Sequence, residues 1–207
     1  MTDRRFHCAL LVLLSVCALG RLAVAQEVNT DRYARVKAGF VLNFLRLTQW
    51  PEETFEDETS PIAVVIVENV SMTPLLRELV EHERIGDRRI NVRVVAYPQP
   101  PEGEYDVEPE RMERFERTLR SAHLLFIGRD QRTRLSSILK IVEDHPVLTV
   151  SDIPRFAERG GMLGLALRDN RLAIDAHPER IRERGIVVSS RVLRLARIVE
   201  DPEQTTR

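Results

Sequence analysis

The segment Pro146–Leu167, PVLTVSDIPRFAERGGMLGLAL, constrains the fold of this chain more than any other. An apolar run ends at Ser151 and Asp152, a short helix is expected to follow, and Gly160 and Gly161 precede a second apolar run. This order of strand, short helix and strand is typical of an open α/β sheet. In such sheets, ligands and partners usually bind just beyond the carboxyl ends of the strands. The segment therefore predicts both a fold class and a site.

The first 25 residues have the features of a secretory signal peptide. Arg4 and Arg5 precede the apolar run Cys8–Leu19, and small residues end at Ala25, as signal cleavage requires. The apolar run is much shorter than the roughly 20 residues that span a bilayer. We therefore expect a periplasmic protein whose signal peptide covers residues 1–25. Both cysteines of the chain lie in this segment, so the exported chain has no cysteine for a nucleophile, a metal site or a disulfide.

The charged residues argue against several classes of partner and cofactor. The formal net charge is −1, and the arginines are interspersed with acids, as in RMERFERTLR. No basic block stands alone, and an exported protein rarely meets nucleic acid, so we expect no nucleic-acid partner. The four histidines beyond the signal peptide are scattered and form no H-x-x-x-H or H-E-x-x-H pair. The sequence therefore predicts no metal site and no cofactor.

Apolar runs with the length of strands alternate with helical patterns along the rest of the chain. This alternation predicts one three-layer α/β domain over residues 26–200, with a mostly parallel sheet flanked by helices and a C-terminal antiparallel hairpin that finishes the sheet. Residues 201–207 are predicted to form a polar tail. The expected strands are 61–69, 89–97, 123–128, 146–150, 162–167 and 171–176, and the expected helices are 29–49, 73–83, 109–121, 132–144, 153–158 and one that begins at Ser189 or Ser190.

Polar residues follow three of the predicted parallel strands. Asn69, Arg129 and the pair Ser151 and Asp152 each come directly after an apolar run. If these strands are parallel, the four residues lie along one edge of the sheet and line a crevice for a ligand or a partner. A simpler interpretation is that Ser151 or Asp152 only caps the next helix, and that strand ends often carry charge. No G-x-S-x-G motif surrounds Ser151, so a hydrolase nucleophile is not indicated.

Three segments together resemble one protein family. VKAGFVLNFLRLTQWP (36–51) is similar to the family's opening helix with its closing Trp-Pro, and SAHLLFIG (121–128) is similar to its central strand. PVLTVSDIPRFAERGGMLGL and RLAIDAHPERIRERGIVVSSRVLRLARIV resemble its C-terminal half. The chain is thereby identified as a member of the YfiR family, over about residues 33–199.

The resemblance implies a function. A YfiR-like protein is expected to bind the periplasmic sensory part of an inner-membrane diguanylate cyclase, or another membrane signalling protein, and to hold it inactive. Its release raises cyclic di-GMP and favours biofilm. Family members also form dimers and disulfides. In this chain Ser121 and Ala122 stand where a cysteine often precedes the histidine, so control through a disulfide is not available.

Three hypotheses follow from the sequence. The first is a regulator that is not an enzyme and acts through protein–protein contact, as the resemblance implies. The second is a sensor that binds a small molecule in the crevice of Asn69, Arg129, Ser151 and Asp152. The third, a hydrolase that uses Asp152, has the least support because no catalytic motif accompanies that residue.

Overall fold

A computed structural model of the chain describes residues 33–68, 71–102, 106–168 and 171–201. The predicted signal peptide and residues 202–207 of the predicted tail lie outside these ranges. Within them, no helix has the length and apolar character that crossing a membrane requires.

A single mostly parallel sheet organises the described residues. Its strand order is β10-β8-β7-β6-β5-β2-β4-β3, and all neighbours are parallel except the β7–β8 and β3–β4 pairs. The fold class and the C-terminal hairpin, β7–β8, are as the sequence predicts. The strands are β2 (Ile62–Val67), β3 (Arg84–Ile85), β4 (Arg88–Val95), β5 (Leu124–Ile127), β6 (Leu148–Ser151), β7 (Leu163–Arg168), β8 (Arg171–Ala176) and β10 (Ala196–Ile198).

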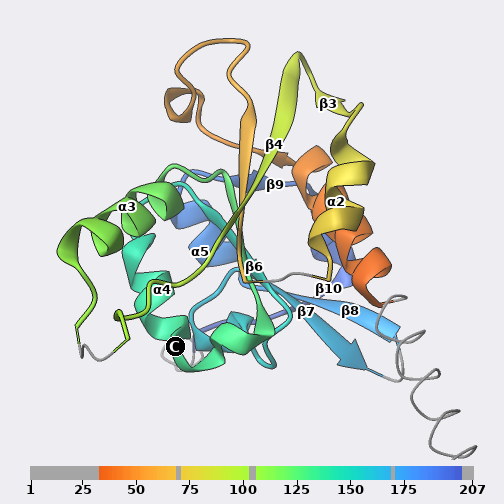
Figure 1. Cartoon of the computed structure of the whole chain (residues 1–207). Helices are drawn as coiled ribbons and strands as arrows, with labels where there is room; N and C mark the ends of the chain where they lie inside the picture. Colours follow the sequence, from red (N-terminus) through yellow and green to blue (C-terminus); the bar gives the residue numbers. More distant parts are fainter. Residues whose placement is uncertain (1–32, 69–70, 103–105, 169–170, 202–207) are drawn as a thin grey trace, which may run out of the picture.

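Helices cover both faces of this sheet and give three layers. Helical residues 33–46 and α2 (Thr73–Val80) lie on one face, and α3 (Pro109–Arg120) and α4 (Leu135–Ile141) lie on the other. Figure 1 shows the first two in orange and yellow, across the sheet from the green α3 and α4. The C-terminal helices are α5 (Pro178–Glu183) and α6 (Ser190–Leu195).

Alternate residues of the central strands enter two separate hydrophobic cores. In β2, Val64 and Ile66 pack with the first helices, whereas Val65 and Val67 pack with α3 and α4. Because both faces are buried, such a strand is an almost continuous apolar run, which explains why the sequence predicts it well.

Several local predictions are wrong, and each error has a physical reason. The first helix ends at residue 46, not 49, because Thr48–Gln49 form strand β1, which pairs with β9 (Val187–Val188). The residues after Asp152 form a turn and a single 3-10 turn, Ala157–Arg159, instead of a helix over 153–158. The hairpin does not finish the sheet, because the chain leaves α6 at Leu195 and adds β10 beside β8.

His123 joins the start of β5 to its surroundings. Its Nδ1 accepts a hydrogen bond from the Ala63 amide (3.0 Å), its carbonyl accepts one from Trp50 Nε1 (2.8 Å), and the Phe55 ring stacks on it with centroids 4.4 Å apart. Burial, and secondly the nearby charge of Arg88, lower the pKa of His123 to about 4. The imidazole is therefore neutral in the folded protein at neutral pH.

We predict that His123 makes the fold sensitive to mild acid. In the unfolded chain a histidine binds a proton near pH 6.5, so stability is lost as the pH falls from 6.5 towards the lowered pKa of about 4. Between pH 7 and pH 5 this one group should lower the free energy of unfolding by about 2 kcal/mol. Urea unfolding at several pH values measures the slope.

His123→Asn keeps an acceptor near Nδ1 and should remove most of that slope. The matched control His82→Asn changes an exposed histidine and should leave the slope as it is in the parent protein. Equal slopes in the His123→Asn variant and the parent would refute this role.

Candidate functional site

The sheet edge at which β2, β5 and β6 end carries three of the four predicted site residues. The three strands are parallel neighbours, so their carboxyl ends lie together. Arg129 donates a hydrogen bond from its guanidinium to the main-chain carbonyl of Asp152 (3.2 Å), and Ser151 is the last residue of β6. Asn69 lies outside the described residues. A binding role for these residues stays a prediction.

Ser151 is a structural residue at this edge. Its hydroxyl donates to the carbonyl of Ile127 in β5 (2.6 Å) and accepts from the amide of Ile153 (3.0 Å). The side chain is fully buried. It caps the turn after β6 as the simpler interpretation expects, although no helix begins there. Because its proton goes to a carbonyl and not to a base, the hydroxyl is not activated as a nucleophile.

Asp152 is the centre of the site. Its carboxylate oxygen Oδ2 lies 2.5 Å from Nζ of Lys37, which comes from the first helix. The side chain of Asp152 is 5% exposed, whereas that of Lys37 is 19% exposed. The second oxygen, Oδ1, is buried and accepts no hydrogen bond from a described residue. One half of this carboxylate is therefore paired and the other half is open to a donor.

A small pocket surrounds this ion pair. Its volume is about 170 Å³, and its polar lining comes from Lys37, Arg129 and Asp152. Aromatic and aliphatic side chains form the rest of the wall: Tyr33, Leu165, Leu167 and Leu172. We call it the Asp152 pocket. Two cations and one carboxylate against an apolar wall suit a small polar molecule that offers both a donor and an acceptor.

The neighbouring crevice between β2 and β5 is filled by the protein itself. The chain order reverses there, since β4 lies on one side of β2 and β5 on the other, which is where open α/β sheets usually bind ligands. Glu68 accepts hydrogen bonds from Gln131 Nε2 (2.5 Å) and from the Tyr97 amide (3.1 Å). A side chain at Gly128 would meet the carbonyls of Val67 and Glu68 at 2.9 Å. The Asp152 pocket lies one strand away from this crevice, at the end of β6.

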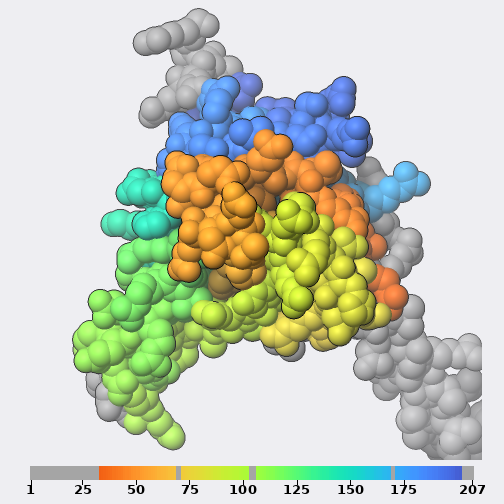
Figure 2. Space-filling view, turned by 90° about the horizontal axis from the view of Figure 1, so that it is seen from above, coloured from red at the N-terminus to blue at the C-terminus, as the bar shows by residue number. Residues whose placement is uncertain are grey.

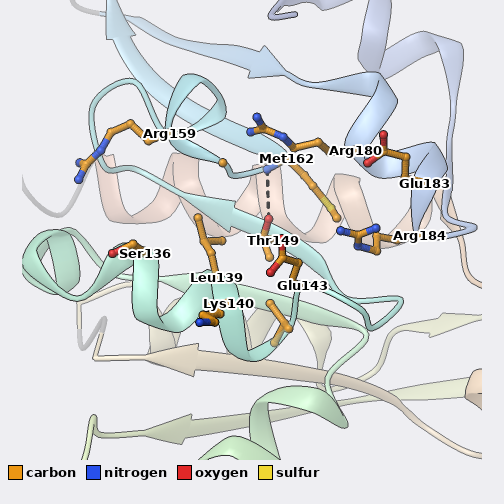
Figure 3. Close-up of a pocket in the computed structure, with 12 residues that line it drawn as sticks. Ser136, Leu139, Lys140, Glu143, Thr149, Arg159, Met162, Arg180, Glu183 and Arg184 are labelled. Atoms are coloured by element: carbon orange, nitrogen blue, oxygen red, sulfur yellow. Dashed lines mark hydrogen bonds between the residues drawn. The ribbon is translucent and has the colours of Figure 1, made fainter. Parts of the chain in front are cut away.

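A second, larger cavity of about 410 Å³ lies between α4 and α5 (Figure 3). Four cationic and two acidic side chains line it, above an apolar floor that includes Leu139 and Met162. Arg180 is held in place, because it donates to the carbonyl of Ala157 (3.1 Å) and pairs with Asp201. None of the predicted site residues lies here. The charged residues are Lys140, Glu143, Arg159, Arg180, Glu183 and Arg184.

The described residues contain no group of three histidine, cysteine or acidic side chains that could hold a metal ion. At the Asp152 pocket the serine is engaged with the main chain and the aspartate is paired with a lysine. This arrangement can bind and orient a small molecule or a partner's side chain. It does not provide the nucleophile and base that a hydrolase needs.

Sequence reasoning missed Lys37, which completes the site. A signal was present: Lys37 and Lys140 are the only lysines in a chain that otherwise uses arginine. Lys37 also follows Tyr33 by four residues, which places both on one face of the first helix. Nothing in the sequence shows that this helix lies against the end of β6, because that contact joins residues 115 positions apart.

Comparison with known proteins identifies one family. The family model described as YfiR/HmsC-like matches residues 34–197, which covers almost all of the described fold, including the first helix, the sheet and α6. No curated protein matches the chain.

We predict that Lys37 and Asp152 are coupled in stability. Lys37→Met leaves a buried carboxylate without its counter-charge and should lower the free energy of unfolding by about 3 kcal/mol. Asp152→Asn should cost about 1 kcal/mol, because the partly exposed Lys37 can turn towards water. The double variant should cost clearly less than the sum of the two, as urea unfolding at pH 7 would show.

The matched control is Lys140→Met, which removes the other lysine. Lys140 is exposed and forms no ion pair with a described residue, so we expect a change below about 0.5 kcal/mol. Strict additivity of the Lys37 and Asp152 variants would contradict the coupling.

Proposed function

The chain belongs to the YfiR/HmsC-like family, and on this premise we propose that it represses an inner-membrane diguanylate cyclase by binding the cyclase's periplasmic sensory domain. The family is one of periplasmic regulators of cyclic di-GMP signalling and not of catalysts. The observation that carries the proposal is the extent of the match, over residues 34–197. The Ser151 hydroxyl and the Asp152 carboxylate, which are engaged within the protein, support contact over catalysis.

The mechanism would be a shift between two states of the cyclase. A repressor changes this equilibrium only if it binds the inactive conformation more tightly than the active one. To hold the cyclase 99% inactive from an even mixture, it must prefer the inactive state by roughly a hundredfold. The signal peptide predicted over residues 1–25 would bring the repressor to the compartment in which the sensory domain lies.

We predict that deletion of the gene raises cyclic di-GMP several-fold and increases biofilm. The full chain should restore the low level, whereas a matched version without residues 1–25 should not, because it stays in the cytoplasm. Cyclic di-GMP is measured by mass spectrometry in the three strains, and proteins bound to the tagged chain are recovered from solubilised membranes. Unchanged cyclic di-GMP together with no recovered cyclase would refute the proposal.

A second candidate function, a small-molecule sensor, is favoured by the Asp152 pocket. The buried Oδ1 of Asp152 lacks a hydrogen bond from a described residue, and such a group is costly unless a donor reaches it. Lys37 and Arg129 flank it with positive charge. A bound metabolite could then adjust how firmly the regulator holds its partner, so the two functions are compatible.

We predict that at least one compound in a panel of amino acids, cofactors and cell-wall fragments raises the melting temperature of the protein. At a concentration 100 times its Kd, such a compound adds about 2.7 kcal/mol of stability. Asp152→Asn should abolish the shift, whereas Glu143→Gln, in the second cavity, should preserve it. A panel without any shift, or a shift retained by Asp152→Asn, would count against this pocket.

A further inference from the structure

One edge of the main sheet is open along most of β4. β2 pairs with residues 90–95 of β4, whereas β3 pairs only with Arg88 and Arg89 at the start of the strand. Among the described residues, Ile90 to Val95 therefore have a neighbouring strand on one side only. The opposite edge of the sheet, β10, has only three residues, so β4 presents the longer open strand.

The direction of the backbone groups on β4 follows from one hydrogen bond. The carbonyl of Val95 accepts from the amide of Glu68 (3.2 Å), so Val95 turns its polar backbone groups towards the β2 side. Successive residues of a strand turn these groups to opposite sides. Ile90, Val92 and Val94 therefore direct their amides and carbonyls towards the open edge. Three donors and three acceptors are available there to another strand.

The open edge results from the path of the chain before β4. A tight turn at Gly86, with φ +60°, joins β3 to β4, and only two residues of β3 pair. Immediately before β3, Glu83 forms an ion pair with Arg46 of the first helix at 2.5 Å. The amide of Glu83 also donates to Val80 at the end of α2 (3.1 Å). These contacts draw the chain away from β4 and keep β3 short.

A groove accompanies the open edge. It has a volume of about 730 Å³ and lies between α2 and the first half of β4. The wall from α2 and the residue after it carries Arg77, Glu78, Val80 and Glu81, and the wall from β4 carries Arg89, Ile90, Asn91 and Val92. Figure 2 shows the yellow-green tip of the β3–β4 hairpin beside the yellow surface of α2. A groove between a helix and an open strand edge is the arrangement in which several domains accept an added strand.

The two faces of β4 define the chemistry of that strand. Ile90 and Val92 pack on the α2 side, and Val94, on the same side, is 38% exposed. On the other face Arg89 and Arg93 are exposed and form no ion pair with a described residue. A strand added here meets Ile90, Val92 and Val94 on one face, and on the other it meets Asn91 between the guanidinium groups of Arg89 and Arg93. The complementary sequence therefore alternates apolar and acidic residues.

We propose that the edge of β4 docks an extended segment of a partner protein, with alternating apolar and acidic residues, as an additional strand of the sheet. A second copy of this chain fits poorly, because its Arg89 and Arg93 would lie on the same face of the joined sheet as those of the first. The proposal goes beyond repression of a cyclase, since it assigns a surface and a binding mode and does not depend on which protein supplies the segment.

The experiment uses the protein purified from the periplasm and a peptide of about eight residues that alternates valine and glutamate. Binding is followed by fluorescence anisotropy, and hydrogen exchange reports on the amides of Ile90, Val92 and Val94. We expect slower exchange at these three amides on binding. The same peptide with alternate amides methylated cannot form the strand ladder, so its affinity should be lower by about tenfold or more.

Variants of the protein separate the backbone and charge contributions. Val92→Pro removes an outward amide. No hydrogen bond to β2 is lost, because the amide of Val92 faces the open edge, and proline is tolerated on such an edge. This variant, and the double variant Arg89→Glu with Arg93→Glu, should each weaken binding by about tenfold or more. Arg191→Glu changes an exposed arginine in α6 and serves as the matched control, with unchanged binding. Circular dichroism establishes that each variant is folded.

Three results would overturn the proposal. The first is that the peptide does not bind, and the second is that it binds Val92→Pro as tightly as the parent protein. The third is a dimer in sedimentation experiments that Val92→Pro dissociates, which would assign the edge to a second copy. Since none of these measurements involves cyclic di-GMP, failure here and failure of the repressor function are distinguishable.

Discussion

The burial of β2 and β5 on both faces is the constraint on which the rest of the fold depends. Val64 and Val65 are neighbours in sequence but belong to different hydrophobic cores, so the strand is stable only when helices cover both sides. This requirement explains the order of the chain, in which the first helix and α2 supply one layer and α3 and α4 supply the other. It also gives the parallel direction of β2, β5 and β6, and hence one edge at which polar residues gather.

At that edge the structure uses polar groups mainly to hold itself together. The hydroxyl of Ser151 forms hydrogen bonds with two main-chain groups. Glu68 and Gln131 bond to each other in the crevice where the chain order reverses. The Lys37–Asp152 pair differs in that one oxygen of a buried carboxylate has no donor among the described residues. The free-energy cost of removing two charges from water offsets much of their electrostatic attraction. A buried ion pair therefore adds little net stability to the fold. A role in binding a ligand or partner explains the Lys37–Asp152 pair better than a role in stability.

The sequence predicts those features that depend on local pattern. The apolar runs of β2 and β5, the C-terminal hairpin and the start of the last helix at Ser189 all follow from residues close together in the chain. The strands β1, β3, β9 and β10 do not, because each has two or three residues and exists only through pairing with a distant segment. Lys37 was missed for the same reason, because its place in the site depends on contact with a distant segment. Asp152 is visible at the end of a strand, whereas its partner depends on where a remote helix packs.

The open edge of β4 connects this fold to a regulatory function. Arginines on an edge strand usually prevent association between identical sheets, since like charges would face one another. The same charges favour an acidic strand, so Arg89 and Arg93 can exclude one partner and select another without any change of conformation. Backbone hydrogen bonds provide the affinity for an added strand, and the side chains determine which sequence binds. A regulator that acts through protein–protein contact needs such a surface, and β4 offers one whose geometry follows directly from the path of the chain.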